Sequence, residues 1–428
     1  MDVITGSVQN YAWGSTTVIP EFLGVESDGR PQAELWFGAH PMAPSLVGSG
    51  SLPALIEADP TRMIGAASVA RFGPRLPYLL KVIAAAQPLS LQAHPTRAGA
   101  EIGFAREEAA GIDRSAPERL YRDDWPKPEM LVALDDVQAL CGFREPDRTY
   151  DLFARLGVPA ATELVAPLRT GGAEQLAAVF ARLLALAEDE RAVVGQVVAA
   201  AAGLGESLSS SVGSDPAGES DPADESGPAG ESERLEFARF ARTVAEIDRH
   251  HPGDPGLLAA LLMNRLSFGR FEGLYLPAGN LHAYLSGTGV EIMANSDNVM
   301  RGGLTPKHVD IAELVSVLDF TPGAPTLVEV IAEGPGIWRY ATPAPEFAMW
   351  RVDLLPGVGV GPIVLPGSGS GRMVLVIEGS VEISDQISTL ALTQGAAAYG
   401  YPCDLLTATG TGTLMVAAAG VAITSASE

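Results

Sequence analysis

A change of periodicity along the chain is the feature that most limits its fold. Between Pro146 and about Asn264, apolar residues recur at the three- and four-residue spacing of a buried helix face. Outside this stretch the apolar runs are short, rich in β-branched residues and broken by Gly and Pro, as in RMVLVIEGSVEIS at 372–384. The pattern predicts a mainly β protein with an inserted helical module, because many short strands with frequent turns indicate sandwiches or barrels.

We expect three units along the chain. Residues 1–145 and 265–321 form one discontinuous barrel, residues 146–264 form the helical insertion, and residues 322–428 form a second barrel with few polar groups positioned for chemistry. Within the insertion, residues 207–233 are rich in Ser, Gly, Pro and acid and contain no aromatic residue, which predicts a disordered acidic loop. An acidic interaction segment is the alternative to a merely solvated loop.

The charge balance limits the partners. The chain has 28 Lys and Arg against 52 Asp and Glu, a net charge of -24, which repels nucleic acid and anionic lipid. Two cysteines far apart in sequence, Cys141 and Cys403, favour a reducing compartment. The first residues do not resemble a signal peptide, and no apolar run is long enough to span a bilayer. We therefore expect a cytoplasmic monomer that acts on a small molecule.

Two segments in the first half of the chain hold candidate metal ligands. In LPYLLKVIAAAQPLSLQAHP at 76–95, Gln92 and His94 are two residues apart, so on a strand their side chains share a face. Their oxygen and nitrogen donors suit zinc, although a buried His is often only hydrogen-bonded. In YRDDWPKPEMLVAL at 121–134, Glu129 opens an apolar run that predicts a buried strand. Its carboxylate can pair with a cation or bind a metal, and Lys127 beside it supplies a positive charge.

A third segment, residues 271–310, is the densest in polar groups. LPAGNLHAY places His282 on a strand-like stretch after a Pro-Ala-Gly turn. The polar residues that follow it are Glu291, Asn295, Asp297, Asn298, Arg301, Lys307 and His308. A salt-bridged turn is the structural alternative, but this density is more typical of a site, where Arg301 and Lys307 can neutralise an anionic group. Gln92, His94, Glu129 and His282 together predict a metal at the mouth of a β-barrel.

The remaining histidines are not needed for this metal site. His40, in ELWFGAHP, is expected to be structural or to line the pocket, whereas His250 and His251 of the helical module are expected at the surface.

These segments closely resemble the type I phosphomannose isomerases, zinc-dependent enzymes of the cupin class. The matching stretches are NYAWGS (10–15), AELWFGAHP (33–41), LLKVIAAAQPLSLQAHP (79–95), KPEMLVAL (127–134), LCGFRE (140–145) and LPAGNLHAYLSGTGVEIMANSDNVMRGGLTPKHVD (276–310). The resemblance implies two cupin-type jelly-roll β-barrels with an inserted α-helical domain and one zinc ion per subunit. It also implies the interconversion of mannose 6-phosphate and fructose 6-phosphate.

The resemblance assigns roles to individual residues. The family's zinc ligands fall on Gln92, His94, Glu129 and His282, and its catalytic arginine falls on Arg301. Its other pocket residues fall on Ser90, Lys81, Lys127, Glu291 and Lys307, which include all three lysines of the chain. We expect Ser90 and the lysines to hold the phosphate. For the base that removes the C2 proton through an enediolate, we consider Glu291 first and Lys81 or Lys127 second.

One departure from the family and two other classes of protein limit this interpretation. Many relatives carry His directly before KPE, where this chain has Pro126, so a proton-transfer role for that His cannot operate here. An iron oxygenase on the same barrel would usually present more His. A non-catalytic metal- or sugar-binding cupin protein would be expected to have lost Arg301 or Glu291, and both are present. The isomerase is therefore the preferred function.

Overall fold

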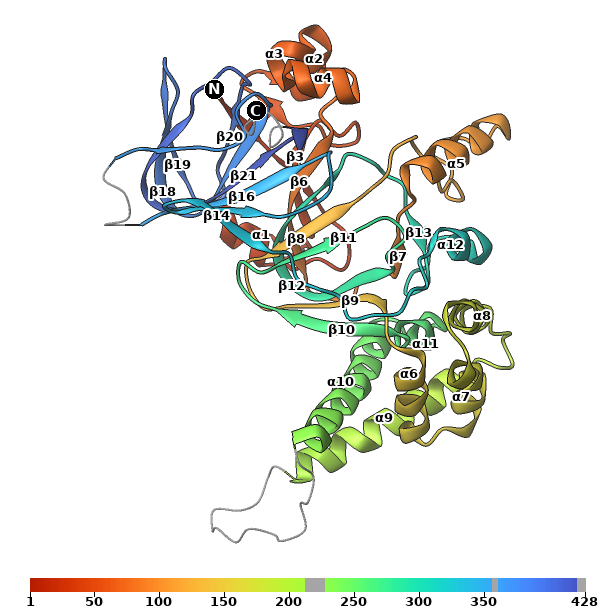
Figure 1. The fold of residues 1–428 in the computed structure, drawn as a ribbon. Coiled ribbons are helices and arrows are strands. Elements are labelled where there is room, and N and C mark those ends of the chain that lie inside the picture. Colours follow the sequence, from red (N-terminus) through yellow and green to blue (C-terminus); the bar gives the residue numbers. More distant parts are fainter. Residues whose placement is uncertain (212–227, 356–360, 422–428) are drawn as a thin grey trace, which may run out of the picture.

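The computed structural model describes residues 1–211, 228–355 and 361–421, and it is mainly β, as the periodicity predicts (Figure 1). Its strands form two large sheets in which the paired strands are antiparallel. In the part of the chain that is described, none of the helices combines the length and apolarity that a bilayer crossing needs.

The first sheet has ten strands and carries the candidate site. Its main path runs β10-β9-β12-β6-β3-β2, and β7, β8, β11 and β13 pair beside it. The bounds are β2 Ser7–Gln9, β3 Glu34–Gly38, β6 Tyr78–Ala85, β7 Gln92–Ala93, β8 Glu129–Ala133, β9 Val137–Phe143, β10 Met263–Phe268, β11 Gly273–Leu276, β12 His282–Ala294 and β13 Met300–Arg301. The long strand β12 pairs with β7 and β9 at its start and with β6 and β8 along its second half.

The second sheet has eleven strands, most of them from the C-terminal part of the chain. Its main path runs β14-β15-β16-β21-β18-β20-β1-β4-β5, with β17 on β21 and β19 on β18. The bounds are β1 Asp2–Thr5, β4 Leu46–Val47, β5 Gly50–Ser51, β14 Val330–Gly334, β15 Ile337–Tyr340, β16 Ala348–Leu354, β17 Ile363–Val364, β18 Arg372–Ser384, β19 Thr389–Thr393, β20 Ala397–Gly400 and β21 Thr407–Ala418.

Strand alternation gives each sheet two different faces. Leu80 and Val82 of β6 and Ile292 of β12 pack in one buried cluster with Met373 and Met415 of the second sheet. The residues between them point the other way, because successive side chains on a strand alternate. Lys81, Glu129 and Glu291 therefore lie on the face of the first sheet that is turned away from this shared core.

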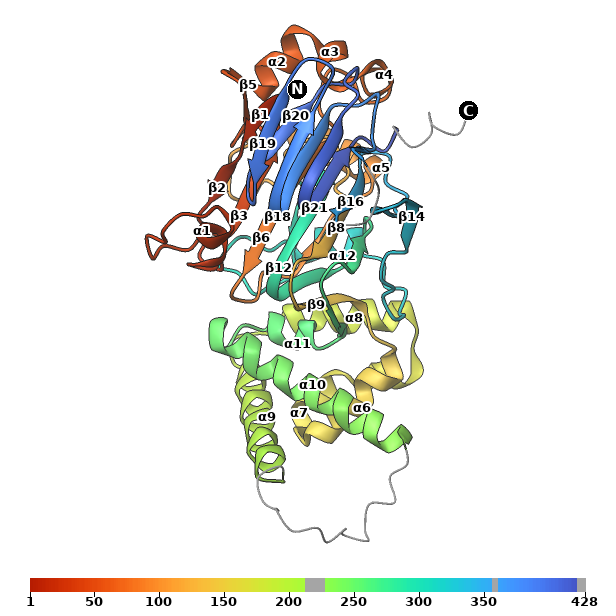
Figure 2. The same cartoon turned by 90° about the vertical axis from the view of Figure 1, so that its left-hand side faces the viewer.

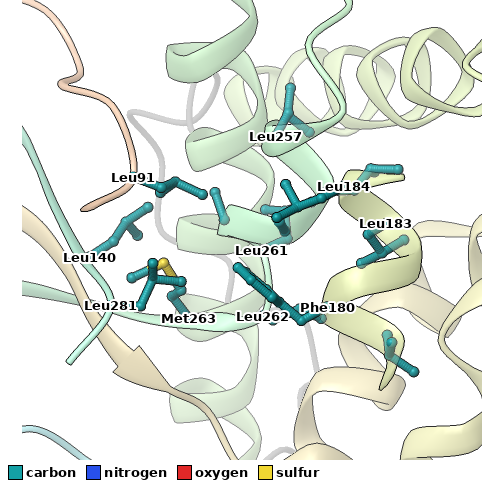
Figure 3. Close-up of a cluster of buried hydrophobic side chains, with 14 of the residues drawn as sticks. Leu91, Leu140, Phe180, Leu183, Leu184, Leu257, Leu261, Leu262, Met263 and Leu281 are labelled. Atoms are coloured by element: carbon teal, nitrogen blue, oxygen red, sulfur yellow. The ribbon is translucent and has the colours of Figure 1, made fainter. Parts of the chain in front are cut away.

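Six α-helices and a 3-10 helix form a module between the two parts of the first sheet. Their bounds are α6 Pro146–Leu156, α7 Pro159–Leu164, η1 Ala166–Thr170, α8 Ala173–Leu184, α9 Ala192–Ser211, α10 Pro228–His250 and α11 Gly256–Ala260. Figures 1 and 2 show the module at one end of the molecule, beside β9 and β10. The junction is apolar: Phe180 and Leu184 of α8 meet Leu140 and Leu281 of the sheet in one buried cluster (Figure 3).

The other helices lie outside this module. They are α1 Val18–Phe22, α2 Leu52–Ala58, α3 Pro60–Ile64, α4 Ala66–Phe72, α5 Arg97–Ala109 and α12 Ile311–Val317. The sequence analysis treated the N-terminal part as strands, so it did not predict the helices α2 to α5. The helix α5 is begun by Thr96, whose side chain accepts a hydrogen bond from the Gly99 N–H.

Three boundaries differ from the sequence prediction. Strand β1 pairs with β20, and β4 and β5 follow β1, so these three strands of the predicted first barrel join the second sheet, where Ile4 packs in the shared core. Strand β10 begins at Met263, inside the predicted helical range. Residues 207–211 continue α9 and residues 228–233 begin α10, so both ends of the predicted acidic loop are helical. The centre of that loop, residues 212–227, lies outside the described residues.

Candidate active site

Three of the four predicted metal ligands converge in the interior. His94 follows β7, Glu129 begins β8 and His282 begins β12, and all three are buried. Their ligand atoms lie within 4.8 Å of one another. The two carboxylate oxygens of Glu129 face one imidazole each, 3.4 Å from His94 Nε2 and 3.3 Å from His282 Nε2. Two nitrogens and a carboxylate in this arrangement form a donor set for a divalent metal such as zinc.

Hydrogen bonds on the far side of each ring set the imidazole tautomers. His94 Nδ1 lies 2.7 Å from the Asn298 carbonyl oxygen, and His282 Nδ1 lies 3.1 Å from that of Asn280. A carbonyl oxygen only accepts, so both Nδ1 atoms carry a proton, and both Nε2 atoms face Glu129. Burial and the charge of Lys127 lower the pKa of His94 to about 4, which keeps this imidazole neutral.

The donor set fits a cation. His94 Nε2 is buried and has no hydrogen-bond partner within the described residues. Burial alone would raise the pKa of Glu129, but Lys127, with Nζ 3.0 Å from Oε1, and the two imidazoles hold it well below its usual range. Lone pairs of a neutral imidazole and an ionised carboxylate therefore face each other, an arrangement that a metal ion between them would satisfy.

Gln92, the fourth predicted ligand, lies beside this group. It pairs directly with His282 across the β7–β12 ladder and with Arg301 across the β7–β13 ladder. It also lines a small cavity of about 70 Å³ together with Glu129 and His282. Strand register thus brings the amide to the edge of the three buried ligands.

A buried ion pair borders the same small cavity. Lys81 Nζ lies 3.2 Å from Glu291 Oε2 and 3.8 Å from Glu34 Oε2, and Tyr284 donates a 3.0 Å hydrogen bond to Glu291 Oε1. Burial would lower the pKa of Lys81, but the carboxylates outweigh it and the pKa is raised. Burial raises the pKa of Glu291, with Lys81 opposing. A lysine with a raised pKa keeps its proton, which favours Glu291 over the alternative base Lys81.

A larger cavity of about 600 Å³ opens beside the buried group. Lys81, Gln92 and Lys127 line both cavities, so they stand between the metal ligands and the larger space. The larger cavity is also lined by Ser90 and Lys307, the predicted substrate-binding residues, and by Arg301, the predicted catalytic arginine. All ten predicted site residues therefore belong to one continuous region.

Several pocket residues were missed or misplaced by the sequence analysis. His40 lines the large cavity, one of the two places expected for it, and its Nε2 lies 3.2 Å from Asp297 Oδ1. His251, expected at the surface, also lines the cavity, with Nε2 3.2 Å from the Pro88 carbonyl oxygen. Glu34 and Tyr284 each stand two residues from a residue of the pocket, Trp36 and His282, so strand alternation could have indicated them.

Arg122 is the pocket residue with the weakest sequence signal. It lines the large cavity from the irregular segment between α5 and β8, where no periodicity predicts its direction. Burial and the charge of Arg122 lower the pKa of Arg301, and burial, Arg301 and Arg122 lower that of Lys307. Positive charge therefore accumulates on one part of the cavity wall.

Comparisons with known proteins agree with this geometry. The family model described as phosphomannose isomerase type I, catalytic domain, matches residues 1–146. The chain is 36% identical over 423 residues to the mannose-6-phosphate isomerase of Salmonella typhimurium, covering 97% of this chain and 98% of that protein. It is 38% identical over 363 residues to the Escherichia coli enzyme, covering 83% and 84%.

A solved structure extends the likeness to the whole fold. The crystal structure of mannose 6-phosphate isomerase from Salmonella typhimurium bound to its substrate fructose 6-phosphate and a zinc atom is similar with a TM-score of 0.82 at 34% sequence identity. The match covers 98% of this chain and 99% of that one. Sequence and fold agree over nearly the full length, and the chain belongs to the type I phosphomannose isomerase family.

Proposed function

We propose that the protein interconverts mannose 6-phosphate and fructose 6-phosphate by proton transfer, with one zinc ion per subunit. The observation that carries the proposal is the position of the His94, Glu129 and His282 donor set beside a cavity lined by cations. A sugar phosphate needs both features, since its phosphate is anionic and its isomerisation develops negative charge on the C1 and C2 oxygens.

Gln92, His94, Glu129 and His282 would hold the zinc. When bound there, zinc supplies a Lewis acid that polarises substrate oxygens. The chain contributes the rest: Asn298 and Asn280 fix the imidazole tautomers through their carbonyl oxygens, and Lys127 keeps Glu129 ionised.

Proton transfer between C2 and C1 needs a carboxylate near the sugar. Glu291 is the base that the sequence analysis prefers, and its raised pKa suits a group that takes and returns a proton. Asp297 is the second candidate, because 29% of its side chain is exposed against 3% for Glu291, and it lines the large cavity. Arg301 would steady the developing oxyanion or position the sugar, in the second case through its phosphate.

The phosphate would lie in the large cavity, which Glu291 does not line. Ser90 offers a hydroxyl donor there, and Lys307 offers an ammonium group. Lys81 and Lys127 are each paired with a buried carboxylate. Their charges are therefore largely compensated, and their role is to hold Glu291 and Glu129 in place.

The two sheets would correspond to two cupin-type jelly-roll barrels. In this assignment residues 263–321 and most of residues 6–145 build the catalytic barrel, and residues 146–262 the helical domain. Residues 322–428, together with β1, β4 and β5, build the second barrel. The acidic net charge and the two unpaired cysteines support a reducing cytoplasmic environment, without a nucleic-acid or membrane partner. We also propose a monomer.

The test is fructose 6-phosphate formation from mannose 6-phosphate by the purified protein before chelation, after chelation and after zinc is restored. We expect activity to disappear with the metal and to return with it. No turnover by folded, zinc-loaded protein would contradict the isomerase and favour the non-catalytic sugar-binding protein.

A further inference from the structure

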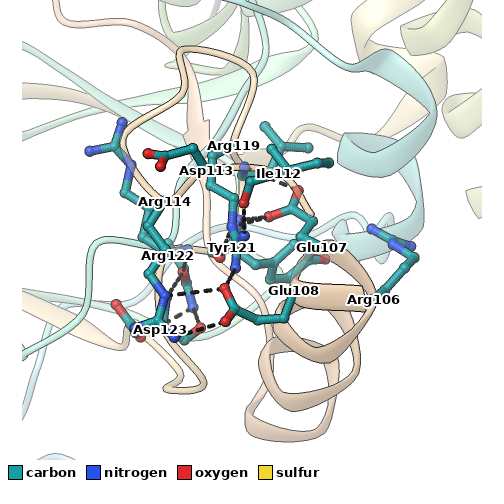
Figure 4. Close-up of polar contacts among 12 residues, drawn as sticks. Arg106, Glu107, Glu108, Ile112, Asp113, Arg114, Arg119, Tyr121, Arg122 and Asp123 are labelled. Carbon is teal, nitrogen blue, oxygen red and sulfur yellow. Dashed lines mark hydrogen bonds and ion pairs between the residues drawn. The ribbon is translucent and has the colours of Figure 1, made fainter. Parts of the chain in front are cut away.

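The backbone that carries Arg122 is fixed from two sides. On one side the buried Arg119 binds Glu107 and Glu108 of α5, each with an N to O distance of 2.8 Å, and donates to the Tyr121 carbonyl oxygen at 2.7 Å (Figure 4). On the other side Asn298 Oδ1 accepts from the Arg122 N–H at 2.8 Å. The segment is irregular but not loose, because buried charges and amides hold each end.

Asn298 connects this backbone to the metal ligands. Its carbonyl oxygen takes the 2.7 Å hydrogen bond from His94 Nδ1, while its side-chain amide donates to the carbonyl oxygens of Asp123 and Trp125 at 2.8 and 2.9 Å. Asn298 is fully buried. One residue thus sets the position of a metal ligand and of the Arg122 backbone together.

The Arg122 side chain has no such partner. Within residues 1–211, 228–355 and 361–421, its guanidinium makes no ion pair and no hydrogen bond, and the same is true of the side-chain nitrogens of Arg301 and Lys307. Arg119, three residues earlier, is paired with two carboxylates. The fold therefore uses Arg119 to build the segment and leaves Arg122 facing the cavity.

The acids of the cavity wall are engaged elsewhere. Glu34 faces Lys81 and accepts a hydrogen bond from Trp36 Nε1 at 2.5 Å, and Asp297 faces His40. Arg122 helps to lower the pKa of Asp297, but the ion pair of Asp297 is with His40. Burial first, and then the neighbouring cations of the same cavity, lower the pKa of Arg301 and Lys307. An anion with several acceptor oxygens would relieve this repulsion.

We propose that Arg122 binds the substrate phosphate, together with Arg301 and Lys307, and that this contact sets the preference for phosphorylated over neutral sugars. The inference rests on the proposed isomerase function and adds a residue that the sequence did not indicate. A guanidinium presents two parallel N–H donors to a phosphate, whereas Lys307 offers a point charge. The link through Asn298 holds the phosphate end of the substrate at a fixed position relative to His94.

The kinetic test compares zinc-loaded wild-type protein with Arg122→Gln. Losing a charge-assisted contact that is made equally in the ground and transition states is expected to raise KM for mannose 6-phosphate about tenfold, with kcat changed by less than about threefold. The rate constant kcat/KM for unphosphorylated mannose should not change. Arg122→Lys keeps the positive charge but loses the two parallel N–H donors. Its KM for mannose 6-phosphate should lie between those of the wild type and Arg122→Gln.

Arg114→Gln is the matched control. Arg114 lies in the same segment, pairs with Glu108 at 2.9 Å, is 62% exposed and does not line the cavity. It should leave KM for mannose 6-phosphate unchanged. An equal rise of KM in Arg122→Gln and Arg114→Gln would mean that any loss of positive charge weakens binding, and it would overturn the proposal.

Titration calorimetry with inorganic phosphate separates this inference from the proposed function, because it needs no turnover. We expect Arg122→Gln to raise the Kd for phosphate by about tenfold relative to wild type. An unchanged Kd, or no phosphate binding by the folded wild-type protein, would overturn the role of Arg122. Phosphate binding that depends on Arg122 in a protein without isomerase activity would keep this inference and remove the isomerase.

Discussion

The two sheets use the same strand alternation to bury opposite kinds of side chain. Turned away from the shared core, the first sheet carries Lys81, Glu129 and Glu291. The equivalent face of the second sheet carries Val374, Val416 and other apolar residues in a closed cluster. Antiparallel pairing alone therefore does not require buried charge. Because an ion in the interior is costly unless it is paired, the charges of the first sheet mark where the chain maintains chemistry.

The second sheet has one large charged exception, and it supports the same conclusion. Arg372 is almost fully buried, with its guanidinium bonded to the carbonyl oxygens of Leu365, Pro366 and Asp404. These partners are backbone groups, and Arg372 lines neither of the two site cavities. A buried charge can thus serve folding alone. Backbone partners and a position away from the cavities distinguish this structural role from a catalytic one.

The largest expected effect comes from removing the carboxylate of the metal group. Glu129→Gln takes away a charged ligand and leaves Lys127 without its partner, so activity should fall by at least about 1000-fold. Bound zinc, measured by mass spectrometry of the purified protein, should fall with it. Ile383→Val in the apolar cluster of the second sheet is the control, and it should cost only about 1 kcal/mol of stability.

The second prediction separates the two proton-transfer candidates. If Glu291 is the base, Glu291→Gln should lower kcat about 100-fold with zinc content unchanged. Asp297→Asn is the comparison, since it preserves shape and the cavity lining. A greater loss of kcat in Asp297→Asn, with Glu291→Gln nearly active, would assign proton transfer to Asp297.

The third prediction concerns the charge of the second sheet. Arg372→Met leaves three carbonyl oxygens without their donor and should cost about 3 kcal/mol of unfolding free energy. Chemical denaturation measures the loss. The KM and kcat of the folded fraction should match wild type, and a selective loss of kcat would mean that the second sheet takes part in the reaction.

The smallest expected effect is a displaced acid limb in the pH profile. The base acts only when deprotonated, so kcat rises with pH through its pKa, and the pKa of Glu291 is raised by burial against the opposing charge of Lys81. The acid limb should therefore have its midpoint above the usual range of a glutamate, and kcat should fall about tenfold for each pH unit below it. Burial would raise the pKa of Asp297, but the hydrogen bond and charge of His40 outweigh it and the pKa is lowered. A midpoint below the usual range of an aspartate would therefore favour Asp297 as the base.

The sequence indicated the site better than the boundaries of the fold. Glu129 and His282 begin predicted strands and lie where alternation places them, because a strand fixes side-chain direction every second residue. Arg122 escaped prediction because its irregular segment is directed by Asn298, far away in sequence. The His40 and Asp297 pair likewise joins two distant segments, and no local pattern records such a contact.

Tertiary pairing also explains the errors in the fold. The strand β1 is four residues long and carries no signal for which sheet it joins. The packing of Ile4 in the shared core decides the matter. The helices α2 to α4 are short and bury few residues each, so their periodicity is too brief to recognise.

The pairing of β1 with β20 has a consequence for synthesis on the ribosome. Asp2 lies opposite Tyr399 and Ile4 opposite Ala397, so the earliest strand to emerge must wait for one of the last. Until then Ile4 and the apolar side chain of Met373 lack part of their cover. Such delayed long-range pairing slows folding and prolongs the exposure of apolar surface that can aggregate. Chaperone dependence should therefore be strongest for nascent chains that stop before β20.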